Sequence, residues 1–217
     1  GIGDGDTGYH TLDRYMYKES GSIESVVTMS QDTDVPAGEG FGYSMKFDCT
    51  TAESALAADE FVNIQQRIEG QDVQHLKKGT ASAVSLTISF WIKSTKTGTY
   101  ICSLYDSDNT RSISKTYTVS TTNTWEKKTI TFAGDTSGAF DNDNAASLLL
   151  IIYLLAGSNS TSGTLATSWQ SHVVADAAVG QVNALDNTSN NIYFTGIQLE
   201  VGSTATEFEH RRYSEEL

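Results

Sequence analysis

The chain has 217 residues, of which 38% are hydrophobic, 19% are charged and only one is proline, and its formal net charge is −13 at pH 7. A chain of this length can bury one good core, and this composition is typical of many short strands joined by polar turns. The excess of acidic side chains disfavours a nucleic-acid backbone or an anionic membrane surface as a partner, because both would repel it. No apolar run is long enough to cross a bilayer, so we expect no membrane insertion.

Alternation of apolar and polar residues predicts most of the first half of the chain as strands. Residues 1–10 are rich in glycine and aspartate, which indicates a flexible N-terminal segment. A single helical turn is expected over residues 71–76, and the clearest strand of the protein, 85–94, should be central in its sheet because its two faces differ so sharply. The other strands predicted in this half cover residues 12–18, 23–31, 41–49 and 61–69.

The second half of the chain continues the pattern, with one exception. Residues 147–155 contain the run LLLIIYLL, which does not alternate, so both faces of this strand must be covered by a loop or by a neighbouring subunit. The long loop 156–190 is the expected cover. Further strands are predicted over residues 99–105, 111–119, 125–132 and 191–200.

These elements predict an all-β fold, an antiparallel two-sheet β-sandwich formed by a single domain over residues 1–217. After the last strand, residues 202–217 are expected to form an extended tail that leads into a short C-terminal helix start, because Ser214 can cap the helix and acids follow it. Cys49 and Cys102 fall on the apolar faces of two strands and are expected to be buried free thiols.

No motif for catalysis stands out. The chain has no G-x-S-x-G elbow, no H-E-x-x-H, no glycine-rich phosphate loop and no C-x-x-C pair, and its four histidines are scattered. A pair of carboxylates for glycan cleavage could hide among the 27 acidic residues, but nothing in the pattern singles one out. We therefore expect a protein that is not an enzyme, with a polysaccharide-degrading activity as the less favoured reading.

A structural calcium ion is the one cofactor to weigh. Three loops contain D-x-D pairs, as calcium ligands often do, but none continues into a full calcium-binding loop, and aspartate is common in turns for conformational reasons. Solvated turns are the preferred interpretation, with no cofactor. The pairs are Asp4 with Asp6, Asp106 with Asp108, and Asp141 with Asp143.

Aromatic side chains give the candidate ligand site, because sugars stack on aromatic rings while neighbouring polar groups fix their orientation. Trp91 lies on the polar face of its strand, Trp169 and His172 lie in the long loop, and Tyr105 begins an acidic turn. The alternative for Trp91 is cover by a loop or subunit, and for Trp169 a plug that anchors the loop onto the LLLIIYLL strand. Trp125 opens a strand and is read as structural.

The closing residues QLEVGSTATEFEHRRYSEEL resemble the terminal signature of a family of bacteriophage virion proteins found in tail fibres and related appendages. Blocks over residues 12–17, 61–76, 85–94 and 123–138 agree with the same family, although it usually has proline where Glu207 stands. Its members usually run on past the closing glutamates, so a fragment is expected. The resemblance implies a jelly-roll sandwich of the carbohydrate-binding-module type, located in a virion and made in the cytoplasm of a bacterial host.

Two functions follow as hypotheses. The first is a non-enzymatic tail-fibre or appendage module that recognises a glycan on the host surface through weak sites multiplied by avidity. Its partners would be other virion proteins and further copies of itself, a trimer above all, which would also cover the LLLIIYLL strand and Trp91. The second is a purely structural virion component, such as a capsid decoration, collar or connector domain. Exposed aromatic residues in loop 156–190 would favour the first, and packed ones the second.

Overall fold

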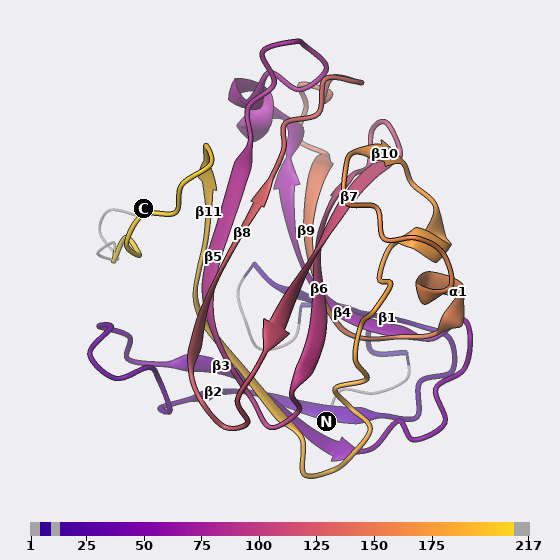
Figure 1. Cartoon of the computed structure of the whole chain (residues 1–217), viewed down its shortest axis with the longest axis vertical. Coiled ribbons are helices and arrows are strands. Elements are labelled where there is room, and N and C mark those ends of the chain that lie inside the picture. Colours follow the sequence, from indigo (N-terminus) through magenta and orange to yellow (C-terminus); the bar gives the residue numbers. More distant parts are fainter. Residues whose placement is uncertain (1–4, 10–13, 211–217) are drawn as a thin grey trace.

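The computed structural model describes residues 5–9 and 14–210. Two antiparallel sheets face each other (Figure 1). One has the strand order β1 (Met16–Ser20), β4 (Phe61–Glu69), β9 (Ala146–Ala156), β6 (Gly98–Asp106), β7 (Arg111–Val119) and β10 (Gln170–Ser171). The other has the order β2 (Val26–Asp32), β3 (Ser44–Thr51), β11 (Asn191–Val201), β5 (Leu86–Ser94) and β8 (Glu126–Phe132). We call them the six-stranded and the five-stranded sheet.

The predicted all-β sandwich is therefore confirmed, and its strands lie close to the ranges expected from alternation. The helical turn expected over 71–76 is the 3₁₀ helix η1 (Gly70–Leu76). The first strand begins later than expected, at Met16, and part of the predicted range falls outside the described residues. The predicted C-terminal helix start also lies outside them. No helix of the described residues is both long and apolar enough to cross a membrane.

The position predicted for β5 was wrong. β5 is second from the edge of its sheet, between β11 and the edge strand β8, and β11 takes the middle place. Alternation shows only that one face of a strand is buried, so it cannot separate the middle strand of a sheet from its neighbour.

The main core fills the space between the sheets with aromatic and branched side chains. Phe90 and Phe194 of the five-stranded sheet lie against each other with ring centroids 6.0 Å apart. Phe90 also meets Tyr117 of the six-stranded sheet edge-on at 5.2 Å. Cys49 and Cys102 are buried free thiols, as predicted.

Strand β9 is buried on both faces, and the chain's own loop supplies the second cover. Alternate residues such as Leu150 and Ile152 join the main core, while Ile151 and Tyr153 join a smaller apolar cluster with Leu165 and Ala178 of the following segment. Residues 157–190 run alongside β6 and β7 (Figure 1) and contain the short helices α1 (Ser158–Thr161) and η2 (Val174–Asp176). Loop cover is thus confirmed, and this strand no longer argues for a trimer.

A β-bulge divides β11 into two halves. Ile192 and Phe194 point into the core before it, and Ile197 and Leu199 pack against the core after it, so the inward positions change from even to odd numbers. The shift falls between Thr195 and Gln198. It lets both halves of the strand keep one face on the core.

Candidate functional site

The outer face of the five-stranded sheet carries a row of aromatic and charged side chains. Residues of β5 alternate, so Trp91 and Lys93 point away from the core that holds Phe90 and Ile92. Trp91 pairs in register with Thr195 on one side and with Lys127 on the other.

The loop between β2 and β3, residues 33–43, crosses this face from one side. Its Asp34 carboxylate accepts a hydrogen bond from the indole Nε1 of Trp125 at 2.9 Å and forms an ion pair with Lys93. The hydrogen bond from Lys93 is the main cause that lowers the pKa of Asp34 below its ordinary value. Further along the loop, the ring of Phe41 packs directly on Gly196. A Cβ at this position would lie 2.4 Å from the ring, and its φ of +59° also favours glycine.

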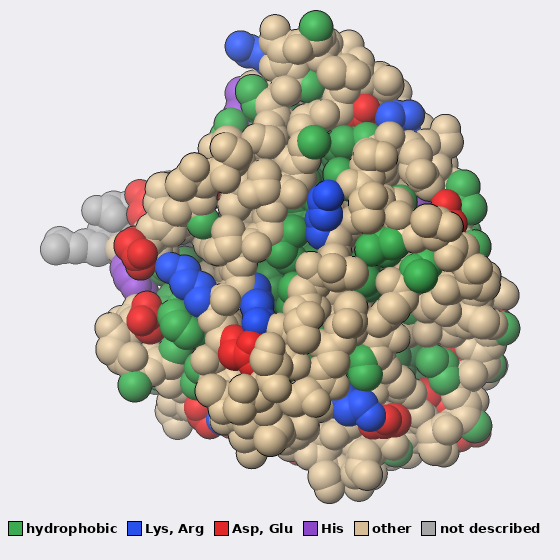
Figure 2. Space-filling model, viewed as in Figure 1, with side chains coloured by type: hydrophobic (Ala, Val, Ile, Leu, Met, Phe, Trp, Pro, Cys, Tyr) green, Lys and Arg blue, Asp and Glu red, His purple; other side chains and the backbone are tan. Residues whose placement is uncertain are grey.

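The chain after β11, residues 202–210, folds back over the same face from the other side, and we call it the strap. Glu200 accepts hydrogen bonds from the amide and the hydroxyl of Thr206 at 3.0 and 2.6 Å. The amide of Glu209 donates to the Gln198 side chain at 2.9 Å. Figure 2 shows acidic, basic and histidine side chains gathered at the left of the view, on the side where Figure 1 places β11 and the strap that follows it.

The loop and the strap meet in a small aromatic cluster. The rings of Phe41, Phe208 and His210 lie 4.9 to 5.0 Å from one another, centroid to centroid. His210 Nε2 also lies 3.2 Å from the carbonyl oxygen of Glu39. The two segments therefore close over the sheet without covering it completely.

A pocket of about 250 Å³ remains between them, with Trp91 in its wall. Lys127 and Glu207 form an ion pair at 3.5 Å, and Glu207 is 90% exposed, so its carboxylate is free to turn toward a ligand. Apolar walls with a few polar groups are what a small-molecule or sugar site needs. The walls are formed by Trp91, Phe41, Phe208, His210, Lys127 and Glu207, together with the backbone around Gly38 and Glu39.

A second group of rings extends this surface beyond Trp91. Trp125 and Tyr193 lie edge to face, 6.2 Å apart. The ammonium of Lys93 lies 4.6 Å from the centre of the Tyr193 ring, and that of Lys46 lies 5.5 Å from it. These are half-buried groups on the outer face, so they can offer both stacking and hydrogen bonds.

The structure does not bring the four residues predicted for the site together. Trp91 lies on the outer face of the five-stranded sheet, whereas Tyr105 and His172 lie in contact on the six-stranded sheet, with ring centroids 5.1 Å apart. His172 Nδ1 is 3.0 Å from the hydroxyl of Ser112, which is only 3% exposed.

The side chain of Trp169 packs against the protein and is not presented to a ligand. Its side chain lies against the main core, and its Nε1 donates a hydrogen bond to the carbonyl of Ala133 at 2.7 Å. The ammonium of Lys78 lies 5.6 Å from the ring centre. These contacts are those of a residue that anchors its loop. Packed aromatic residues in loop 156–190 were expected of a purely structural virion component, so Trp169 favours that hypothesis. A ligand role for Trp169, Tyr105 or His172 remains a prediction.

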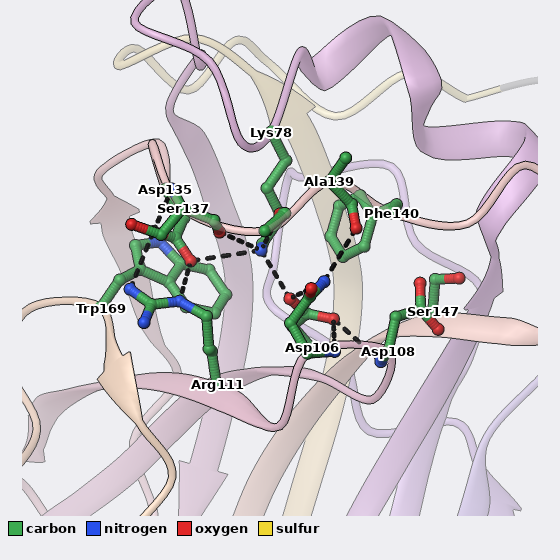
Figure 3. Close-up of polar contacts among 12 residues, drawn as sticks. Lys78, Asp106, Asp108, Arg111, Asp135, Ser137, Ala139, Phe140, Ser147 and Trp169 are labelled. Atoms are coloured by element: carbon green, nitrogen blue, oxygen red, sulfur yellow. Dashed lines mark hydrogen bonds and ion pairs between the residues drawn. The ribbon is translucent and has the colours of Figure 1, made fainter.

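Lys78 stands at the centre of a buried charge cluster (Figure 3). Its ammonium contacts the carboxylates of Asp106 at 2.5 Å and Asp135 at 3.2 Å, and donates to the carbonyls of Ser137 and Gly138 at 2.9 and 2.6 Å. Arg111 binds Asp135 through two nitrogens, at 2.6 and 3.0 Å. Asp106 belongs to one of the D-x-D pairs considered above as calcium ligands. In the structure its carboxylate forms an ion pair with the Lys78 ammonium.

Burial alone would raise the pKa of Asp135, but hydrogen bonds from Arg111 and the Ser137 amide, with the charge of Lys78, hold it below its ordinary value. Within residues 5–9 and 14–210, no three His, Cys, Asp or Glu side chains form a group that could hold a metal ion. The absence of a cofactor stays a prediction, with a structural calcium ion as its less favoured alternative, and Asp4 lies outside the described residues.

His172 provides a pH-dependent test of the six-stranded side. Burial lowers its pKa below the ordinary 6.5, although the charge of Asp176 opposes this. The unfolded chain therefore binds a proton before the folded one does, and the free energy of unfolding should fall as the pH decreases through about 6.5. Urea unfolding between about pH 8 and pH 5 would measure this. The slope should flatten in His172→Gln, and an unchanged slope would contradict the assignment.

Sequence reasoning missed the loop and strap residues around Trp91. Phe41 was placed in a strand, and Phe208 and His210 were noted only as part of the closing signature. No pattern in the sequence could bring residues 41 and 208 together, because the contact depends on how the strap turns after Gly202.

Comparisons with known proteins give only similarities of fold. No protein-family model matches the chain, and no curated protein matches it. Among solved structures, an enzymatically active domain of tailspike protein 4 of bacteriophage CBA120 is 15% identical with a TM-score of 0.49. That match covers 87% of this chain but 19% of the tailspike chain, so the chain spans about a fifth of it.

Two of the similar structures are carbohydrate-binding modules. The family 11 module from Clostridium thermocellum, solved with a β-1,3-1,4-mixed-linked tetrasaccharide, is 14% identical with a TM-score of 0.43 and coverage of 88% and 91% of the two chains. The N-terminal cellulose-binding domain of Cellulomonas fimi β-1,4-glucanase C is 11% identical with a TM-score of 0.44 and coverage of 94% and 97%.

Proposed function

We propose that this chain is a non-enzymatic glycan-binding module, and that the ligand binds at the Trp91 pocket on the outer face of the five-stranded sheet. The observation that carries the proposal is the pocket itself, where an indole lies beside an exposed carboxylate and an ammonium. One face of a sugar ring is apolar and packs on an indole, while its hydroxyls need donors and acceptors around the rim.

The neighbouring row gives room for more than one sugar residue. Tyr193 and Trp125 continue the aromatic surface from Trp91 along the same face, with Lys93 and Asp34 between them as polar partners. A ligand that spans both parts would gain from each contact, and each contact alone would be weak.

We further propose a virion setting, as part of a tail fibre or related appendage that attaches to a host-surface glycan. This part rests on the sequence resemblance of residues 198–217 and the four other blocks. Copies of the chain, as a trimer or another homo-oligomer, and other virion proteins would hold several weak sites together and raise their avidity. The packing of Trp169 keeps a purely structural virion component as the second candidate.

A glycan array with the purified, multimerised chain tests the proposal, run beside a Trp91→Ala variant. Loss of the indole should weaken binding about tenfold or more, which corresponds to about 1.4 kcal/mol. Tyr9→Ala is the matched control, because Tyr9 is an exposed aromatic residue next to the β1 end of the other sheet.

The melting temperature of each variant is compared with that of the wild type. An unchanged value shows that weaker binding comes from a lost ligand contact and not from unfolding. A Lys127→Ala variant, which keeps the indole, should also bind more weakly than the wild type. Binding to no glycan by the wild type, or equal binding by Trp91→Ala, would contradict the proposal.

A further inference from the structure

The strap takes up the polar groups that a ligand on this face would use. The side chain of Gln198 donates to the Thr206 hydroxyl and to the Glu207 carbonyl at 3.3 and 3.4 Å, and Glu200 accepts twice from Thr206. The hydroxyl of Thr87 donates to the Gly202 carbonyl at 2.8 Å. Amides, carboxylates and hydroxyls in a row are also the groups that bind sugar hydroxyls.

The burial of outward-facing residues of β5 also indicates that the strap covers polar groups that a ligand could use. Thr87 and Ser89 belong to the outer face of β5, yet they are 0% and 3% exposed. Thr87 is closed off by its bonds to Gly202 and to Thr131, whose two hydroxyls lie 3.0 Å apart. Trp91 is the next outward residue along the same strand, so the covered row continues directly from the Trp91 pocket.

The strap is held mainly by side-chain contacts, which a ligand could replace with contacts of its own. Gly202 makes the last backbone hydrogen bond, from its amide to the carbonyl of Ser85 at 2.8 Å. Residues 203–208 make no hydrogen bond from backbone to backbone with another described residue. Most of them are exposed, and Phe208 is the main apolar anchor. Segments with few buried contacts and no backbone ladder open at low free-energy cost.

A hinge lies at the start of the strap. Gly202 has a φ of +109°, and a Cβ built there would meet no atom within 4 Å. Glycine tolerates this conformation and many others, so rotation at this residue can lift the strap without disturbing β11.

We propose that the strap acts as an internal ligand mimic, covering an extension of the Trp91 site that takes a glycan chain of several residues once the strap swings away. Backbone carbonyls and amides of the strap hold the positions that sugar hydroxyls occupy in the open form. The inference rests on the proposed function and adds the class of ligand, a chain long enough to reach from Trp91 to Glu200. Ligand and strap compete for the same groups, so binding shifts the population toward the open form.

A Thr206→Pro variant tests this, because proline removes the Thr206 amide and hydroxyl that bind Glu200 and leaves Trp91, Phe41 and Lys127 in place. Thr204→Pro is the matched control, an exposed position in the same segment. Hydrogen exchange of residues 203–210 reports strap opening without any ligand. Binding is then measured on an oligosaccharide array graded in length from about one to six sugar residues.

We expect faster exchange of the strap in Thr206→Pro and about tenfold tighter binding of the longer oligosaccharides, while single sugars should bind more weakly because Glu207, Phe208 and His210 leave the Trp91 pocket with the strap. Opening of the strap with no gain for the longer oligosaccharides, while the wild type still binds glycan, would overturn the inference and leave the proposed function standing. Binding of no oligosaccharide by wild type and variant alike would overturn both.

Discussion

Replacing Lys78 with methionine is expected to lower the free energy of unfolding by about 3–5 kcal/mol, because removal of one partner leaves buried charges without compensation. The Lys78 side chain is 4% exposed, and those of Asp106 and Asp135 are 0% and 3% exposed. Methionine keeps the length of the side chain and its contact with the nearby Phe140 ring but removes the ammonium. Urea denaturation at neutral pH would measure the change.

The matched control is Lys96→Met, which breaks the ion pair with Asp186 at the surface. Both partners of that pair are about one third exposed, so its loss should cost less than about 1 kcal/mol. A double variant, Lys78→Met with Asp106→Asn, should recover part of the stability because it removes the unpaired charge. Equal losses for Lys78→Met and Lys96→Met would show that the cluster does not stabilise the fold as described.

Replacing Ile151 with alanine is expected to cost about 2–5 kcal/mol of unfolding free energy, as for other large residues removed from a core. Ile151 is on the second face of β9 and packs in the cluster with Leu165 and Ala178. A loop that merely touched this strand would give a smaller loss. Thermal and urea unfolding, with light scattering to record the mass, would measure the result.

Val201→Ala serves as the control, because Val201 is 51% exposed and should change the stability by less than about 0.5 kcal/mol. The intramolecular cover also predicts that Ile151→Ala leaves the oligomeric state unchanged. Dissociation of a stable oligomer by this variant would show that another subunit, rather than the loop, covers the strand.

The strands could be predicted from the sequence because each strand buries one face, and a buried face appears in the local sequence as alternating apolar and polar residues. The run LLLIIYLL also led to the loop that covers it, since nothing else of sufficient length was near in the chain. Neighbours in the sheet could not be predicted in this way, as the place of β11 between β3 and β5 shows.

The candidate site was predicted only in part. Trp91 was identified because it broke the polar face of a strong strand, and the structure gives it a pocket. The cluster around Lys78 was missed because its members are far apart in the chain. Lys78 lies between η1 and β5, Asp106 ends β6 and Asp135 follows β8, and only folding brings the two carboxylates to the Lys78 ammonium. Charge partners distant in sequence leave no local pattern.

The bulge in β11 adds one residue to the strand. Because inward positions change from even to odd numbers there, Gly196 and Ile197 together stand opposite the single residue of β5 between Ser89 and Trp91, which is one residue more than plain pairing needs. Losing Gly196 would therefore restore plain alternation and keep Ile197 and Leu199 on the core, but it would remove the glycine on which the Phe41 ring packs. Losing one residue from 203–205 would instead leave β11 intact and shift Thr206 away from the Glu200 carboxylate that it binds. The extra residue thus serves the loop that covers the sheet rather than the pairing of the sheet itself.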